Sequence, residues 1–203
     1  MRGRVAKLSG LVACGLMALS VPTAHAATLV TNGGFETGSF SGWTLTGNTG
    51  FTGVDGNAHS GSFAAFLGAV GSNTFLSQTL NTTAGTQYDL TFWLANDGGR
   101  PNDFGVSFNG IALTGGGSPA LPITNANSFP YTEYSFDVTA TGALTALVFD
   151  VRQDPAFFHL DDVSVVALSA TPLPAALPLF GAGLGLLGFI GRRKKKKGLP
   201  MAA

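Results

Sequence analysis

The chain has 203 residues, of which 45% are hydrophobic and 11% are charged, and its formal net charge at pH 7 is zero. That zero averages unlike parts, because residues 27–170 hold all 11 acidic residues and only two basic ones, which gives this segment a net charge of −9. A segment this acidic repels phosphate backbones, so nucleic acid is excluded as a partner and cation binding is favoured.

The N-terminus has the three parts of a secretory signal peptide. A positively charged start precedes an apolar stretch and a small-residue cleavage site, and these parts are Arg2, Arg4 and Lys7, then residues 8–21, then Ala24 to Ala26. We expect signal peptidase to cut after Ala26, so residues 1–26 are removed and the rest of the chain is exported.

Cys14 offers an alternative, because Leu11 precedes it at the spacing of a lipoprotein cleavage box. Only three residues separate Lys7 from Leu11, which is short for the apolar core of such a signal. With the signal peptide removed, the exported chain contains no cysteine and therefore no disulfide.

Residues 27–170 have the size of one domain and the pattern of an all-β fold. Glycine, threonine, serine and asparagine separate short apolar runs, and no stretch repeats its apolar residues with a helical period. The predicted strands are 29–30, 43–46, 63–67, 75–80, 87–95, 104–108, 132–138, 144–151 and 157–166. Strands at such short intervals are typical of two packed antiparallel sheets.

The clearest alternation lies in the predicted strand 87–95, where apolar and polar positions take turns and Trp93 falls on the polar face. An indole exposed among polar groups can stack on a pyranose ring. We therefore predict a ligand-binding face that consists of Trp93, Asp89, Glu133 and Arg152. The alternative is that a sheet edge or a loop, such as Asp97 to Pro101, covers the indole.

Four phrases follow one another along the domain: Asn32 to Glu36 with Gly42-Trp43, Ala58 to Ser62, Ala84 to Trp93, and Phe158 to Val163. In this order they resemble galactose-binding-like jelly rolls, in particular the carbohydrate-binding modules attached to bacterial glycanases. The resemblance covers nearly all of residues 28–168. It implies a two-sheet antiparallel jelly-roll sandwich that binds polysaccharide without catalysing a reaction.

Phe35 and Trp43 stand in an otherwise polar, glycine-rich stretch, so we expect them in the core of the sandwich. Gly33 and Gly34 are predicted to take the positive φ angles of a turn and to point Glu36 inward.

The resemblance also implies a structural Ca²⁺ ion at one edge of the sandwich. Its ligands would be Glu36 and Asp161, with Asp162 as a further candidate, together with backbone carbonyls of Ser60 to Ser62. Calcium takes about six to eight oxygen ligands, and acids from both ends of the domain would tie its first and last strands together. The alternative is that these acids are solvent-exposed in turns.

An enzyme is not predicted. Paired carboxylates serve glycosidases, but no substrate cleft is evident around these acids. His59 and His159 have no serine or cysteine in a nucleophile elbow. The glycines at 183, 185 and 188 match dinucleotide-binding spacing without the strand and acid that this motif requires.

The C-terminus contains a short proline motif, an apolar stretch and a basic cluster, namely Pro172-Leu173-Pro174, residues 175–191, and Arg192 and Arg193 with four lysines. As a helix, residues 173–190 would span roughly 27 Å, close to the ~30 Å hydrocarbon core of a bilayer. The cations stay in the cytoplasm, so the domain before residue 171 lies outside.

This layout resembles the PEP-CTERM sorting signal over residues 171–197, followed by a short tail at 198–203. Leu173 replaces the usual glutamate, which makes it a proline-leucine-proline variant. The resemblance implies processing by an exosortase-type membrane protease and delivery to the cell surface or the extracellular matrix. The alternatives are a plain membrane anchor without processing and, for the domain, a structural or adhesive protein that binds no sugar.

Overall fold

The computed structural model describes residues 27–168, which form nine β-strands. The strands are β1 (Thr44–Gly47), β2 (Phe51–Asp55), β3 (Ala64–Asn81), β4 (Gln87–Asn96), β5 (Asn102–Phe108), β6 (Ile111–Ala112), β7 (Ile123–Thr124), β8 (Phe129–Thr139) and β9 (Leu144–Ala167). Within these residues no helix has the length and apolarity needed to cross a membrane. The predicted signal peptide and sorting signal lie outside the described residues.

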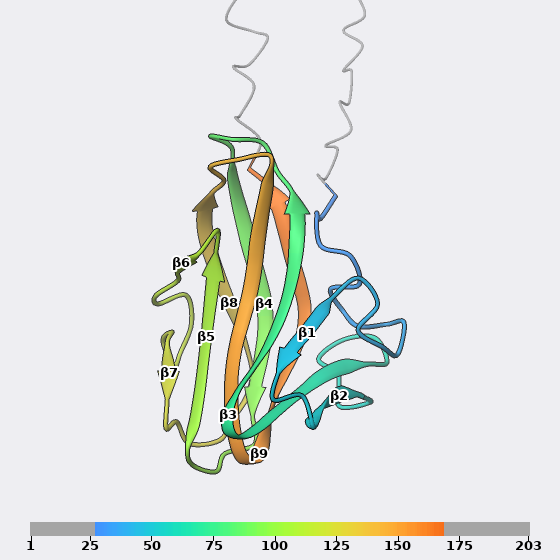
Figure 1. Ribbon diagram of the computed structural model, residues 1–203, viewed down its shortest axis with the longest axis vertical. Helices are drawn as coiled ribbons and strands as arrows, with labels where there is room; N and C mark the ends of the chain where they lie inside the picture. Colours follow the sequence, from blue (N-terminus) through green and yellow to red (C-terminus); the bar gives the residue numbers. More distant parts are fainter. Residues whose placement is uncertain (1–26, 169–203) are drawn as a thin grey trace, which may run out of the picture.

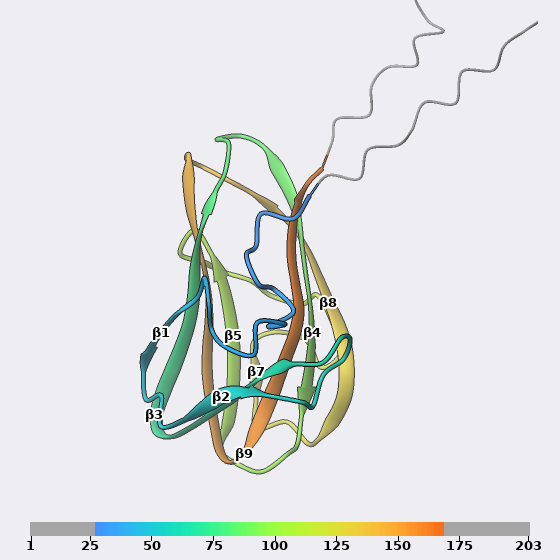
Figure 2. The same ribbon diagram turned by 90° about the vertical axis from the view of Figure 1, so that its right-hand side faces the viewer.

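Two layers of antiparallel strands share β3 and β9, which each bend and continue from one layer into the other (Figures 1 and 2). The first sheet contains β1, residues 74–81 of β3, residues 144–153 of β9, and β5 with β6 and β7. The second sheet contains β2, residues 64–67 of β3, residues 158–167 of β9, β4 and β8. The prediction of an all-β antiparallel sandwich is thus confirmed.

The bends explain where the predicted strands were wrong. The sequence predicts separate strands at 63–67 and 75–80, but these are one strand whose register with β9 shifts between Leu67 and Thr74. Predicted strands 144–151 and 157–166 are likewise the single strand β9, which passes from one sheet to the other between residues 153 and 158, where Pro155 lies. Proline donates no ladder hydrogen bond, so it belongs at such an interruption.

Three strands, β2, β6 and β7, were not predicted, and the predicted strand at 29–30 is absent. The segment at 29–30 makes a backbone hydrogen bond to β9, from Leu29 N to Val165 O at 2.8 Å. The strand β2 escaped prediction because Gly53 interrupts its apolar pattern. Glycine is needed there, since a Cβ at Gly53 would lie only 2.5 Å from the ring of Phe66.

The core lies where the two sheets meet face to face. Phe92 of the second sheet meets Phe149 of the first edge-on, with ring centroids 5.4 Å apart, and stacks on Tyr134 at 5.1 Å. The alternation predicted for 87–95 is confirmed, because every second side chain of β4 is buried. Phe35 and Trp43 are buried and stack at 5.7 Å, as predicted. Each buried ring contributes roughly 1.5–3 kcal/mol.

The turn at 32–36 differs from its prediction. Positive φ angles occur at Asn32 (54°) and Phe35 (55°) instead of at Gly33 and Gly34, and Glu36 is exposed instead of pointing inward. Gly33 serves another purpose, because a Cβ there would overlap the backbone carbonyl of Val163. Val163 N in turn donates to Gly33 O at 3.0 Å, so the turn lies directly against β9.

Candidate functional site

Three carboxylates hold residues 57–63, the loop between β2 and β3, which we call the clamped loop. Asp161 is fully buried, and its Oδ2 accepts hydrogen bonds from His59 N (2.8 Å) and Ser60 N (3.1 Å). Its Oδ1 accepts from Asp162 N at 2.7 Å. Burial raises the pKa of Asp161 above its ordinary value, and the hydrogen bonds from these backbone N–H groups oppose that rise.

A β-bulge brings the neighbouring acid to the same loop. Consecutive residues of a strand normally face opposite sides, but the register between β4 and β9 shifts here and Asp162 has a φ of 49°. Asp162 therefore also reaches the clamped loop, where Oδ2 accepts from His59 Nδ1 (2.7 Å) and Oδ1 accepts from Ser60 Oγ (2.8 Å).

Glu36 holds the other end of the clamped loop. Its Oε1 accepts hydrogen bonds from Ser62 N (2.9 Å) and Phe63 N (3.0 Å). Gly61 lies against this carboxylate with a φ of 65°, and a Cβ there would overlap Oε1. Glycine at position 61 thus allows both the backbone conformation and the close approach.

The three acids predicted to bind calcium are therefore brought together. A Cβ on Gly34 would lie 3.6 Å from Asp162 Oδ1 and 3.7 Å from Asp161 Oδ1. However, the clamped loop turns N–H groups toward these oxygens, where the prediction placed carbonyls of Ser60 to Ser62. No group of three or more His, Cys, Asp or Glu side chains within residues 27–168 is arranged to hold a metal ion. As arranged, these residues do not fit calcium, and hydrogen bonds fasten the loop.

Trp93 faces outward from the second sheet, as predicted, but the clamped loop covers it. The His59 imidazole stacks on the indole with ring centroids 3.7 Å apart and an interplanar angle of 11°. The ring of Tyr131 also lies beside His59, with ring centroids 5.4 Å apart, and its hydroxyl donates to Asn57 O at 2.6 Å. Burial above all, and then Asp161 and other nearby acids, raise the pKa of Tyr131. The predicted sugar platform is thus occupied on one face by a side chain of the protein.

The other predicted ligand-binding residues fall on two different faces. Glu133 is the cross-strand partner of Trp93, and Asp89 lies further along the same face, where it accepts from Ser135 Oγ at 3.2 Å. Arg152 was predicted on this face, and that prediction is wrong. Arg152 lies in the first sheet, where Asp103 is its cross-strand neighbour. The strand β9 bends into the second sheet only after residue 153, so outward side chains before the bend and after it belong to different faces of the molecule.

Arg152 instead belongs to what we call the polar face, the outward side of the first sheet. A row of cross-strand neighbours runs across it from Thr46 through Phe75 and Asp150 to Gly105. Phe75 is 36% exposed. Asn73 Nδ2 donates to Asp150 Oδ1 at 2.6 Å, and Gly105 leaves the space beside Asp150 open.

The guanidinium of Arg152 is unpaired among residues 27–168. Its Nε is shielded from solvent without a hydrogen-bond partner, and no carboxylate there lies within 4.0 Å of its nitrogens. Its two terminal nitrogens are not shielded in this way, so they are available to donate to a ligand. Sequence reasoning missed the polar face. The alternating residues Asn73, Phe75 and Ser77 can be assigned to the outward side of a sheet only when it is known which side of the strand faces the core.

No protein-family model matches the sequence, and a comparison with curated proteins finds no relative. Among solved structures, the chain is similar to TmCBM61 in complex with β-1,4-galactotriose, with 21% identity and a TM-score of 0.55 over 70% of this chain and 100% of that one. It is also similar to the CBM22-1 xylan-binding domain of Paenibacillus barcinonensis Xyn10C, with 17% identity and a TM-score of 0.50 over 73% and 100% of the two chains.

The fold is a jelly roll like that of carbohydrate-binding modules. This confirms the fold that the resemblance implied. A cyclase from Fischerella sp. TAU has a similar fold, with 19% identity and a TM-score of 0.51 over 71% of this chain and 99% of that one. The same architecture therefore carries both binding modules and an enzyme, and function has to be argued from surfaces.

Proposed function

We propose that residues 27–168 form a non-catalytic carbohydrate-binding domain whose sugar site is the polar face. The observation that carries this proposal is Phe75, an exposed ring among hydrogen-bonding groups on the outward side of the first sheet. The C–H groups of a pyranose pack on an aromatic ring, and its hydroxyls bond the polar neighbours. Polar surroundings of this kind suit a ligand that carries a hydroxyl on nearly every carbon.

The partners around Phe75 supply both hydrogen-bonding senses. The Asp150 carboxylate accepts, while the Arg152 guanidinium donates. These two residues are separated by roughly 7 Å along β9 at the usual rise per residue. A sugar ring stacked on Phe75 would therefore have an acceptor beside it and a donor within reach of its substituents. The Trp93 face fits less well, because His59 already occupies one side of the indole.

The test is glycan binding by the purified protein and two matched variants. β-1,4-Galactan and xylan are the first probes, since similar modules were solved with galactotriose or are described as xylan-binding. We expect Phe75→Ala to weaken binding about tenfold or more, because an aromatic platform contributes about 1.5 kcal/mol or more. Trp93→Ala should bind normally.

Other results would redirect or end the proposal. Loss of binding in Trp93→Ala alone would return the sugar site to the second sheet. Absence of binding to any glycan would favour the structural or adhesive alternative. Turnover of a polysaccharide by the wild-type protein would overturn the non-catalytic assignment.

We also propose that the domain is exported and then sorted through its C-terminal tail by an exosortase-type protease. The proline motif, apolar stretch and basic cluster of residues 172–197 support this proposal. The test is mass spectrometry of the mature protein from the cell surface. Processing predicts a C-terminus before the basic cluster, and an intact Lys197 on surface protein would exclude it.

A further inference from the structure

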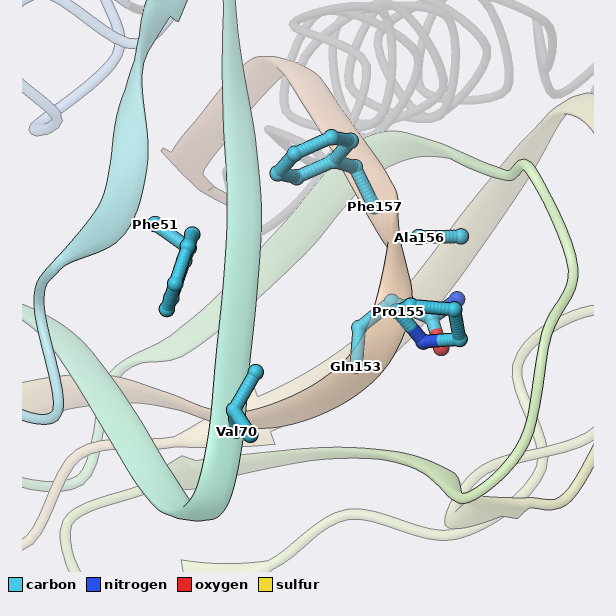
Figure 3. A pocket seen from close by; sticks show the side chains of 6 residues that line it. All are labelled: Phe51, Val70, Gln153, Pro155, Ala156 and Phe157. Atoms are coloured by element: carbon cyan, nitrogen blue, oxygen red, sulfur yellow. The ribbon is translucent and has the colours of Figure 1, made fainter.

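A hollow of about 220 Å³ lies where β3 and β9 bend between the sheets, at the pole opposite the two ends of the described chain (Figures 1 and 3). Six uncharged residues line it, and all except Gln153 are apolar: Phe51, Val70, Gln153, Pro155, Ala156 and Phe157. Phe51 is 54% exposed and Val70 is 45% exposed, so this small region leaves two large apolar side chains in water. Exposed apolar surface around a concavity is typical of a binding site.

The two phenylalanines differ in how firmly they are held. Phe157 packs edge-on against Phe66 at 5.3 Å and lies over Gly68, where a Cβ would come within 2.9 Å of its ring. Phe51 is the cross-strand partner of Gly68 and so has no side chain opposite it to pack on. The hollow therefore has one aromatic wall packed against a neighbouring ring and one aromatic wall that is largely exposed.

Gln153, the one polar residue that lines the hollow, donates its amide N–H to a residue outside it. Gly98 N donates to Asn96 Oδ1, which fixes the orientation of the Asn96 amide. Gln153 Nε2 donates to the same oxygen, and Gln153 as a whole is 1% exposed. In the view of Figure 3 its amide end overlaps Pro155, and its Oε1 is shielded from solvent without a hydrogen-bond partner among the described residues. A ligand in the hollow thus meets apolar surface with almost no hydrogen-bonding group.

We propose that this hollow binds a small, uncharged aromatic or alicyclic ring, independently of the sugar site on the polar face. An apolar protein cavity of about 150 Å³ is large enough to bind benzene, so the hollow has room for a single ring or a compact bicycle. A sugar fits poorly, because its hydroxyls would lose water without gaining partners. A charged ligand fits poorly for the same reason.

The experiment is a ligand-observed NMR titration of the purified full-length protein with indole and with p-cresol, and with galactose as the polar comparison. We expect saturable binding of both apolar rings, and no galactose binding that depends on Phe51 or Val70. Phe51→Ala should weaken ring binding about tenfold. Val70→Asp, which places a charge in the hollow, should abolish it.

Ile111→Ala is the matched control, because Ile111 is 63% exposed but lies in a different hollow beside Phe108 and Asp137. It should leave ring binding unchanged. Circular dichroism confirms that each variant is folded. The proposal would be overturned if neither ring bound saturably. It would also be overturned if Phe51→Ala and Val70→Asp bound the rings as tightly as the wild type does. Binding of galactose with the same sensitivity to these variants would replace it with a sugar site, while neither result bears on Phe75.

Discussion

His59 lies parallel to Trp93, with their rings 3.7 Å apart, and is held there by a 2.7 Å hydrogen bond from its Nδ1 to Asp162. The stack joins the clamped loop to the outer face of β4. It also explains how a large aromatic side chain can face outward from a sheet without being a free platform. The stability of the loop is therefore coupled to the surface of the second sheet.

His59→Ala should lower the free energy of unfolding by about 1–2 kcal/mol, because it removes both the stack and the hydrogen bond to Asp162. Chemical denaturation measures this difference. Ser60→Ala is the control, since it removes only the hydroxyl bond to Asp162, and its effect should be smaller. Equal stability of His59→Ala and the wild type would show that the stack does not hold the loop.

Asp161→Asn should be more damaging than Asp162→Asn. The Asp161 carboxylate is fully buried and accepts hydrogen bonds from three backbone N–H groups. In Asp161→Asn the amide NH₂ would face some of these N–H donors and could not accept their hydrogen bonds. The expected loss in unfolding free energy is about 2–4 kcal/mol. The Asp162 side chain is 31% exposed, so water can replace its partners. A smaller effect at Asp161 than at Asp162 would contradict this account.

The pH dependence of stability should carry the signature of Asp161. Burial raises its pKa in the folded state above the unfolded value, so the folded protein binds the proton more tightly. The contribution of this group to stability therefore increases as the pH falls from neutral toward about 4 and is lost as the pH rises through the folded pKa. In urea melts across this range, the advantage in unfolding free energy of the wild type over Asp161→Asn should therefore widen as the pH falls. A difference independent of pH would refute it.

The calcium ion predicted from the sequence stays a prediction, and thermal melting in EDTA tests it. Hydrogen bonds from the clamped loop already occupy the oxygens of Glu36, Asp161 and Asp162. The observed arrangement therefore predicts an unchanged melting temperature. A melting temperature that EDTA lowers and calcium restores would support the metal instead, and would mean that the loop turns its carbonyls toward the acids.

Gly33→Ala should destabilise the domain by about 2 kcal/mol or more, because the new methyl group overlaps the carbonyl of Val163. Gly50→Ala is the control, since a Cβ there meets no atom within 4 Å. Thermal or chemical unfolding of both variants checks the prediction. Similar stability of the two would mean that the turn at 32–36 shifts away from β9 at little cost.

The sequence was informative wherever a local pattern decides the structure. Alternation along β4 predicted which side chains enter the core and that Trp93 leaves it. The isolated large side chains of Phe35 and Trp43 correctly pointed to the core. The acids at positions 36, 161 and 162 lie around the loop that the resemblance assigned to them, while the calcium site itself stays a prediction.

The rest depends on contacts between distant residues, which no local pattern records. The hydrogen bonds that place His59 over Trp93 join positions more than 100 residues apart. The face on which Arg152 lies depends on where β9 bends. In the sequence, a bend that contains glycine or proline within one strand looks the same as a loop between two strands. Sequence reasoning therefore assigned Arg152 to the wrong sheet and overlooked Phe75.

The course of β9 has a mechanical consequence. Asp150 and Arg152 on the polar face and Ala167 at the outgoing end belong to this one strand, which is hydrogen-bonded to neighbours along both of its arms. If both the proposed sugar site and the proposed C-terminal sorting hold, tension between a bound polysaccharide and the tail would travel along this one strand and around its bend. Such a pull would load many backbone hydrogen bonds of β9 together instead of opening them one by one.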